Sequence, residues 1–167
     1  MRPLRERLLD LPDTGTVIWI AVRPEHGAPM IELDRAAAIE DHGLEGDVAA
    51  RGRGGGPRQV TLAQAEHLPV IAALAGVGLV QPSALRRNVL VAGINLLALA
   101  KMRFAIGDVV LVGTGPCAPC GRMDETIGPF GFQATRGHGG ITARIERAGT
   151  IECGAAVRVL AEPRGPS

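Results

Sequence analysis

The chain has 167 residues, 46% hydrophobic and 21% charged, which is the size and composition of one globular domain. Its net charge of +1 and aromatic content of 2% argue against nucleic acid or an anionic membrane as a partner. The 23 glycines and 12 prolines indicate many tight turns, as in a barrel or sandwich. Three cysteines without an apolar signal segment predict free thiols in the reducing cytoplasm.

The first residues are expected to form a flexible N-terminal segment, and residues 163–167 a flexible tail. The folded core is expected between about residues 15 and 160. Residues 16–23 are rich in β-branched side chains and predict a strand, with 29–33 as its hairpin partner. Residues 41–57 predict a loop. The further predicted strands are 58–62, 88–92, 102–106, 109–112, 141–147 and 156–160.

Helices are fewer than strands in this pattern. Residues 63–75 form the best predicted helix, although Pro69 falls inside it, and residues 117–127 could open a short one. The apolar stretch 69–80 is too short to cross a bilayer. Because helices do not alternate with strands, a βαβ layout is not expected. The sequence therefore predicts a single, mainly β domain: a β-barrel-like core with one or two peripheral helices.

Two cysteines stand in a CxxC motif, Cys117 and Cys120, in a segment rich in glycine and proline. The motif fits half of a zinc site that Cys153 and His138 would complete, or a redox pair at the start of a helix. It also fits two thiols that are only packed in a turn, since free cysteines are often small apolar residues. The last interpretation is a functional thiolate that acts as a nucleophile, sulfur carrier or soft metal ligand.

A glycine-rich segment precedes the strand at 58–62. Gly43, Gly46 and Asp47 belong to Gly-Leu-Glu-Gly-Asp, and three arginines including Arg58 follow. Backbone N–H groups and arginines of this kind can bind phosphate. Neither a Walker loop nor a dinucleotide fingerprint is present, because no Gly-Lys-Ser/Thr and no helix follows the glycines. A solvated surface loop explains the same composition.

Two further polar groups are candidates. Arg86, Arg87 and Asn88 enter a predicted strand, where neighbouring side chains point to opposite faces, so only one arginine is expected at a common site. His138 lies between glycines. It could be a metal ligand, an acid–base group or an ordinary loop histidine.

The order of these motifs resembles the MOSC domain family, found at the C-terminus of molybdenum cofactor sulfurases and in stand-alone bacterial proteins. No single motif is decisive, and the resemblance covers about residues 15–160. Its segments are GLEGD (43–47), RQVTL (58–62), RRNVLVAGINL (86–96), FAIGDVVL (104–111), PCAPCGRM (116–123) and RGHGGITARI (136–145). The resemblance implies a MOSC-type β-barrel.

The resemblance also implies roles for single residues. Cys120, followed by Gly-Arg-Met, matches the family cysteine and would be both catalytic residue and molybdenum ligand, while Cys117 matches an additional upstream cysteine. Arg86 and Asn88 match an Arg-x-Asn strand entry. A molybdenum cofactor would be bound by Arg86, Asn88, Cys117 and the loop residues Gly43, Gly46 and Arg58. Arginine side chains and the amides of the glycine loop would hold its phosphate.

Two functions follow from the resemblance. The first is reduction of N-hydroxylated compounds, with His138, Asp47 or Asp124 as the acid and a separate protein as electron donor. The second is a carrier that receives sulfur from a donor protein as a cysteine persulfide, or transfers the cofactor, with pyridoxal phosphate as a weaker cofactor candidate. The run after Cys120, Arg122 to Glu125, departs from reductase-type members and favours the carrier.

Overall fold

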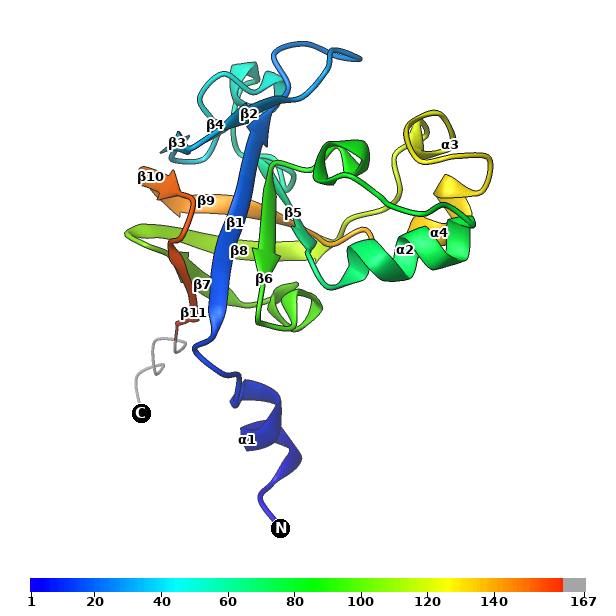
Figure 1. Ribbon diagram of the computed structural model, residues 1–167. Coiled ribbons are helices and arrows are strands. Elements are labelled where there is room, and N and C mark those ends of the chain that lie inside the picture. Colours follow the sequence, from blue (N-terminus) through cyan, green and yellow to red (C-terminus); the bar gives the residue numbers. More distant parts are fainter. Residues whose placement is uncertain (161–167) are drawn as a thin grey trace.

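The computed structural model describes residues 1–160. The first and last strands of this segment lie side by side in the wall of a barrel (Figure 1). Strand β1 (Gly15–Val22) pairs antiparallel with β11 (Ala156–Val159) and closes a seven-stranded barrel in the order β11-β7-β8-β9-β5-β6-β1. Closure removes the two sheet edges that these strands would otherwise expose. The other barrel strands are β5 (Val60–Gln64), β6 (Val89–Ala92), β7 (Arg103–Ile106), β8 (Val109–Pro116) and β9 (Ile141–Arg147).

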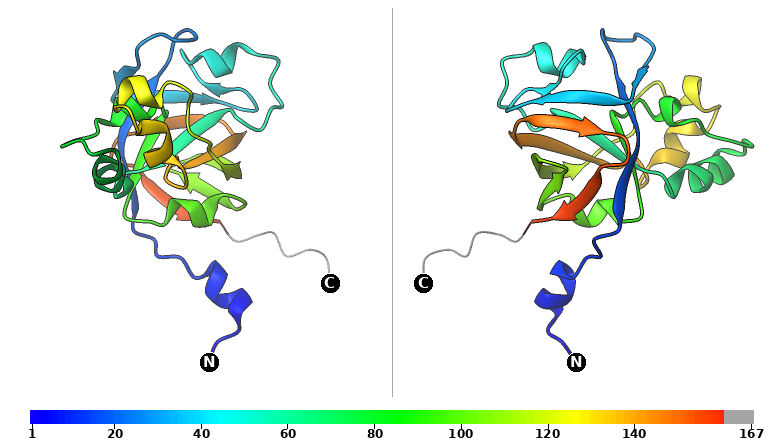
Figure 2. Two further views of the ribbon diagram at one scale, coloured as in Figure 1. Left: turned by 90° about the vertical axis from the view of Figure 1, so that its right-hand side faces the viewer. Right: turned by 60° about the vertical axis from the view of Figure 1, so that its left-hand side comes forward.

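A smaller sheet lies against the barrel. Strand β2 (Ile31–Leu33) pairs with the end of β1, and the chain then enters a three-stranded sheet in the order β10-β3-β4 (Figure 2). The three strands are β3 (Arg35–Ile39), β4 (Gly43–Leu44) and β10 (Gly149–Glu152). Strand β3 contacts β9, and β10 contacts β8, so this sheet extends the barrel at one end.

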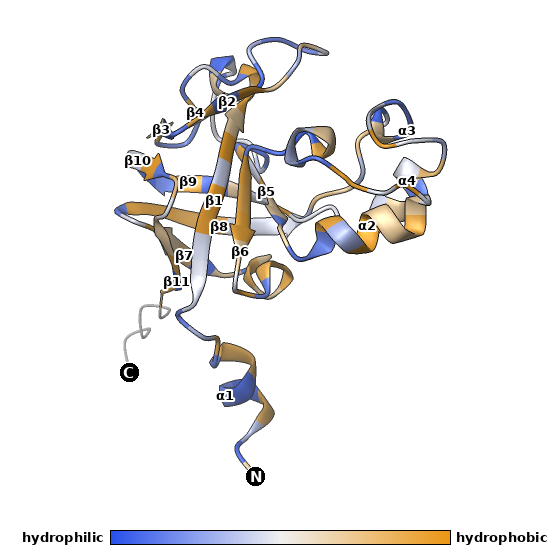
Figure 3. Ribbon diagram, viewed as in Figure 1, coloured by the Kyte–Doolittle hydropathy of each residue, from blue (hydrophilic) through white to orange (hydrophobic). Residues whose placement is uncertain are grey.

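Strands β5 and β6 are apolar on both faces because each separates two cores. Leu62 and Val89 point into the barrel, whereas their neighbours Ala63 and Leu90 pack on the opposite face under the helices. Successive side chains of a strand alternate between its faces, so a strand that is buried on both sides has a continuous apolar run. Figure 3 shows this apolar character along β6.

The helices α2 (His67–Ala75), α3 (Met123–Thr126) and α4 (Gly131–Thr135) cover one side of the barrel (Figure 1). Pro69 is the third residue of α2, where an amide would have no carbonyl partner in the helix, so the proline is tolerated. The helix ends at Gly76, whose φ of 71° is left-handed. Three short 3-10 turns complete the described elements: η1 (Val48–Arg51), η2 (Pro82–Leu85) and η3 (Leu96–Leu99).

The N-terminal segment forms a short exposed helix, and its expected flexibility stays a prediction. Helix α1 (Leu4–Leu9) buries none of its residues and extends away from the barrel (Figure 1). The predicted tail at 163–167 lies outside the described residues. Among residues 1–160, none of the helices combines the length and the apolar character needed to span a bilayer.

The mainly β, barrel-like prediction is confirmed, and the predicted strands correspond to observed ones. One expectation was wrong: β5 and β6 are parallel neighbours connected through α2, which is a βαβ unit. Strands β3 and β10 were not predicted, because alternate residues of each are exposed and β3 contains three alanines. The predicted loop 41–57 also contains β4 and η1.

We expect Gly140→Ala to lower the free energy of unfolding by about 3 kcal/mol or more. Gly140 has a φ of +82°, and an added Cβ would lie 1.8 Å from the Leu62 carbonyl oxygen. Gly137→Ala is the matched control: its φ is +79°, but nothing lies within 4 Å of its Cβ position. Its cost should be only the backbone strain, about 1–2 kcal/mol. Equal denaturation midpoints for the two variants would contradict the steric explanation.

Candidate functional site

The thiol segment connects β8 to α3. Cys117 is 5% exposed, and its amide donates to the Gly140 carbonyl at 2.8 Å. Cys120 is half-buried, and its carbonyl accepts from the Met123 amide at 3.0 Å at the start of α3. One thiol is therefore enclosed and the other accessible, which agrees with Cys120 as the reactive member of the pair.

Cys153 does not join this pair. It is exposed at the turn between β10 and β11, and its amide donates to the Asp34 carbonyl. Partial burial and the carboxylates of Asp34 and Glu32 raise the pKa of its thiol. Within residues 1–160, His, Cys, Asp and Glu form no group of three or more suited to a metal ion. The zinc site completed by Cys153 and His138 is therefore not formed.

Arg87 is the largest fully buried side chain and lies behind the thiol segment. It is 1% exposed; its Nε donates to the Gly139 carbonyl at 2.9 Å and its Nη2 to the Ala118 carbonyl at 2.8 Å. Its remaining nitrogen, Nη1, is buried without a partner among the described residues. Burial lowers the pKa of Arg87, and Cys117, then Cys120, contribute most against that decrease.

Arg86 also lies near the thiol segment, but its side chain bonds to a different loop. It ends η2 with a left-handed φ of 55° and donates from Nη2 to the Ala28 carbonyl at 2.9 Å. Burial, then the charges of Arg23 and Arg122, lower its pKa, while Cys120 acts in the opposite direction. Arg86 and Arg87 therefore bond to different loops, although Cys120 opposes the decrease in pKa of both, so the expectation that only one of them faces a common site stays a prediction.

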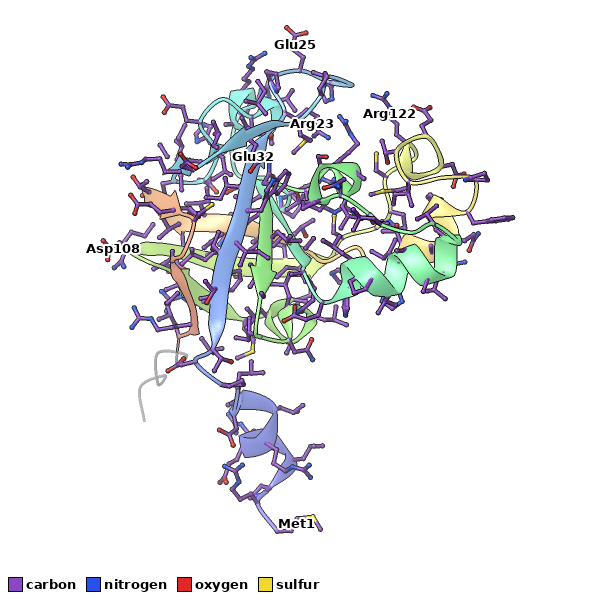
Figure 4. All side chains as sticks on the ribbon, viewed as in Figure 1. Met1, Arg23, Glu25, Glu32, Asp108 and Arg122 are labelled. Atoms are coloured by element: carbon purple, nitrogen blue, oxygen red, sulfur yellow. The ribbon has the colours of Figure 1, made fainter. Side chains whose placement is uncertain are left out.

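Arg23 and Arg122 extend this cationic group. Arg23 follows β1, and its Nε is buried without a partner; Figure 4 labels both side chains. Arg122 donates to the Gly27 carbonyl and pairs with Glu125 at 3.0 Å. Within residues 1–160, that is the only ion pair to a carboxylate among Arg23, Arg86, Arg87 and Arg122. Unpaired guanidinium groups near a thiol fit an anionic ligand.

Asp47 fastens the glycine-rich segment to the barrel. It is 2% exposed; Oδ1 accepts from the Arg23 amide at 2.8 Å and from Asn88 Nδ2 at 3.0 Å, and Oδ2 accepts from the Ala49 amide at 3.0 Å. Both carboxylate oxygens are therefore occupied. This geometry gives Asp47 a structural role and argues against it as an acid for substrate.

Asn88 lies at the centre of the same network. Its Oδ1 accepts from the Thr61 amide and hydroxyl at 3.0 and 3.1 Å, and its Nδ2 donates to the Ala21 carbonyl as well as to Asp47. These contacts join β1, β5 and β6 immediately after the two arginines. Asn88 thus orients Arg86 and Arg87, and its amide has no further hydrogen to offer a cofactor.

The predicted phosphate loop is only partly open. Gly43 is buried in β4, where an added Cβ would lie 2.8 Å from the Gln59 carbonyl oxygen, and Gly46 precedes Asp47 in a turn with a φ of 85°. Gly55 folds back to donate to the Asp41 carbonyl. Arg58 is exposed and lies close enough to Arg87 to interact electrostatically. Of these loop residues, Arg58 is the best placed to reach an anion.

His138 pairs with a histidine that the sequence analysis did not single out. Its ring lies edge-to-face with His67 at the start of α2, with centroids 5.1 Å apart. The Nδ1 atoms of both rings are buried without a partner among the described residues. Asp124, the remaining acid candidate, is exposed and accepts from the Phe132 amide.

The structure thus adds three residues to the candidate site, Arg23, Arg87 and His67. Arg23 had a usable signal, because it directly follows a confident strand and would emerge at one end of it. Arg87 had none: its burial depends on carbonyls of two distant loops. His67 pairs with a residue 71 positions away, which sequence spacing does not reveal.

The MOSC domain model matches residues 49–164, so this chain belongs to the MOSC domain family, a family associated with molybdenum cofactor binding. No curated protein shows a significant sequence match.

Solved structures show the same fold. The YuaD protein from Bacillus subtilis superposes with a TM-score of 0.76 at 20% identity, over 90% of this chain and 98% of that one. YiiM from Escherichia coli gives 0.65 at 18% identity, over 89% and 71%. YiiM from Geobacillus stearothermophilus gives 0.64 at 16% identity, over 93% and 78%. The family model begins at residue 49, but the superpositions cover 90%, 89% and 93% of this chain and therefore include residues that precede it.

We expect acid to destabilise the fold through His67. Burial, then the neighbouring His138 ring, lower the pKa of His67 from 6.5, and Glu66 opposes this only partly. The unfolded chain therefore binds a proton more readily than the folded one. The stabilisation is complete above about pH 6.5 and is lost as the pH falls through the lower folded pKa. Denaturation midpoints from about pH 8 to about pH 5 measure it; an equally steep profile for His67→Gln would refute the assignment.

Proposed function

We propose that this protein binds a molybdenum cofactor, with the Cys120 thiolate as the metal ligand and the surrounding arginines as the binding site for its phosphate. The observation that supports this is positive charge without a carboxylate partner: among residues 1–160, Arg23 Nε and Arg87 Nη1 are buried without a hydrogen-bond partner, and the Arg86 side chain makes one hydrogen bond. A buried cation is costly unless an anion compensates it. An anionic phosphate and a soft metal meet both needs of the site.

The residues of this site would divide the binding between them. Cys120 is half-buried, so its sulfur can reach a ligand while its backbone is fixed at the start of α3. Arg86 and Arg58 offer guanidinium donors from two directions, and Asp47 and Asn88 keep the supporting segments in place. When bound, such a cofactor supplies two-electron redox chemistry and oxygen-atom transfer.

We further propose reduction of N-hydroxylated compounds as the reaction. Converting N–OH to N–H releases water and consumes two electrons and two protons, so a partner protein must supply the electrons. Of the three acid candidates, His138 supports this best, because its Nδ1 has no protein partner, whereas Asp47 and Asp124 already accept backbone amides. A ring nitrogen of His138 would then give its proton to the departing oxygen.

A carrier function is the second candidate, and the enclosed position of Cys117 supports it. A persulfide formed on Cys120 would lie near a second thiol that solvent barely reaches. Pyridoxal phosphate has less support: the single lysine of the chain, Lys101, donates to the Thr114 carbonyl. It is not among the groups that interact electrostatically with Arg86 or Arg87.

We expect elemental analysis to find molybdenum in protein expressed in a host that makes the cofactor, and none from a host that lacks the pathway. Cys120→Ala should remove the metal, because it deletes the ligand, whereas Cys117→Ala should retain most of it. Arg86→Ala should weaken cofactor binding about tenfold or more, through loss of one charge-assisted contact. Wild-type protein with bound persulfide sulfur and no molybdenum in either host would establish the carrier instead.

We expect cofactor-loaded protein to reduce a hydroxylamino-purine when reduced viologen supplies electrons. His138→Gln should lower kcat by about a hundredfold, because it removes the acid and leaves the cofactor in place. Metal content is measured on every sample, so loss of cofactor is separated from loss of catalysis. Turnover by loaded wild-type protein no faster than that of Cys120→Ala would end the reductase proposal.

A further inference from the structure

Arg87 links the two loops that border the thiol site. We propose that it is the positioning residue of this site: one guanidinium fixes the segment that carries both cysteines against the loop that carries His138. Its two carbonyl acceptors are Ala118, between Cys117 and Cys120, and Gly139, next to His138. The inference rests on the proposed function only in taking Cys120 as the functional thiol.

The burial of Arg87 shows that packing alone does not explain it. A guanidinium that is 1% exposed loses its hydration, and no carboxylate among residues 1–160 pairs with it. An apolar side chain of similar volume would fill the space without that cost. The charge is compensated only by two carbonyl dipoles and by whatever negative charge develops at Cys117 and Cys120.

The geometry of the two loops depends on this contact. A groove of about 340 Å³ lies between them, lined on one side by residues 116–119 and on the other by 136, 137, 139 and 140. The Cys117 amide donates to the Gly140 carbonyl where the two loops leave β8 and β9. Beyond that backbone bond, Arg87 bonds to one carbonyl on each side and so holds the two loops together.

Glycine at position 139 makes the clamp possible. An added Cβ there would lie 2.4 Å from the Cys117 carbonyl oxygen and 3.2 Å from Arg87 Nη2. The planar guanidinium directs separate N–H groups to the two carbonyls at fixed angles, which the single ammonium of lysine cannot reproduce. Arginine and glycine are thus required at these two positions for one geometric reason.

The test compares Arg87→Gln and Arg87→Lys with wild type, and uses Arg136→Gln as the matched control. Arg136 lines the same groove but bonds only to the Gln133 side chain, so its removal deletes a charge without touching either carbonyl. Hydrogen exchange at the Cys117 amide reports the clamp. The rate of iodoacetamide alkylation at Cys117, measured at one pH, reports how far that thiol is enclosed, and Cys153 serves as an internal standard for the reagent.

Both Arg87 variants should accelerate exchange at the Cys117 amide by about tenfold or more, while amides of β1 stay unchanged. Alkylation of Cys117 should be about tenfold faster in both Arg87 variants, because neither side chain holds the two carbonyls beside that enclosed thiol. Arg136→Gln should change neither readout appreciably, since its charge is exposed and screened.

Uniformly faster exchange across the barrel in both variants, or an unchanged Cys117 amide, would overturn the proposal and leave Arg87 a packing residue. If Arg87→Gln does not fold, Arg87→Lys decides: faster exchange at the Cys117 amide with unchanged amides in β1 supports the clamp, and wild-type exchange at Cys117 rejects it. These readouts need no cofactor. A protein that binds no molybdenum but shows the expected exchange pattern would refute the proposed function and retain this inference.

Discussion

The hydrogen-bond network of the Asn88 side chain is the constraint on which the rest of the site depends. Its amide joins Thr61 on β5, Ala21 on β1 and Asp47 on the neighbouring loop, all in the barrel wall. A buried amide left without partners costs about 1–3 kcal/mol per group, so these segments cannot separate cheaply. The two arginines directly before it therefore enter the site from a fixed backbone.

The charge distribution follows from that position. Arg86 turns out of the wall in a left-handed conformation and reaches Ala28, while Arg87 turns inward and reaches Ala118 and Gly139. One dipeptide thus supplies both the outer and the inner positive charge around the thiols. Because water screens the outer charge more than the inner one, the two arginines suit different tasks, ligand binding and loop positioning.

The barrel and the helical layer each have a hydrophobic core of their own. β5 and β6 each present one apolar face to the barrel core and one to the helices, so α2, α3 and α4 are packed on a wall that is already rigid. The thiol segment connects the barrel strand β8 to helix α3 of that layer. At this junction Cys120 packs against the helix-side core but is only half-buried, so part of it stays accessible.

The sequence by itself determined the barrel, most of its strands and the cysteine pair, because alternation, glycine turns and the CxxC motif are local patterns. Through the resemblance to MOSC domains, it also predicted that Arg86 and Cys120 belong to one site. Only the tertiary structure decided the roles of Arg87, Asp47 and His67. Each depends on partners more than 20 positions away, such as Gly139, Asn88 and His138, and burial by distant loops leaves no periodic signal. Composition suggested an open phosphate loop; the structure shows that two of its glycines, Gly43 and Gly54, allow close packing.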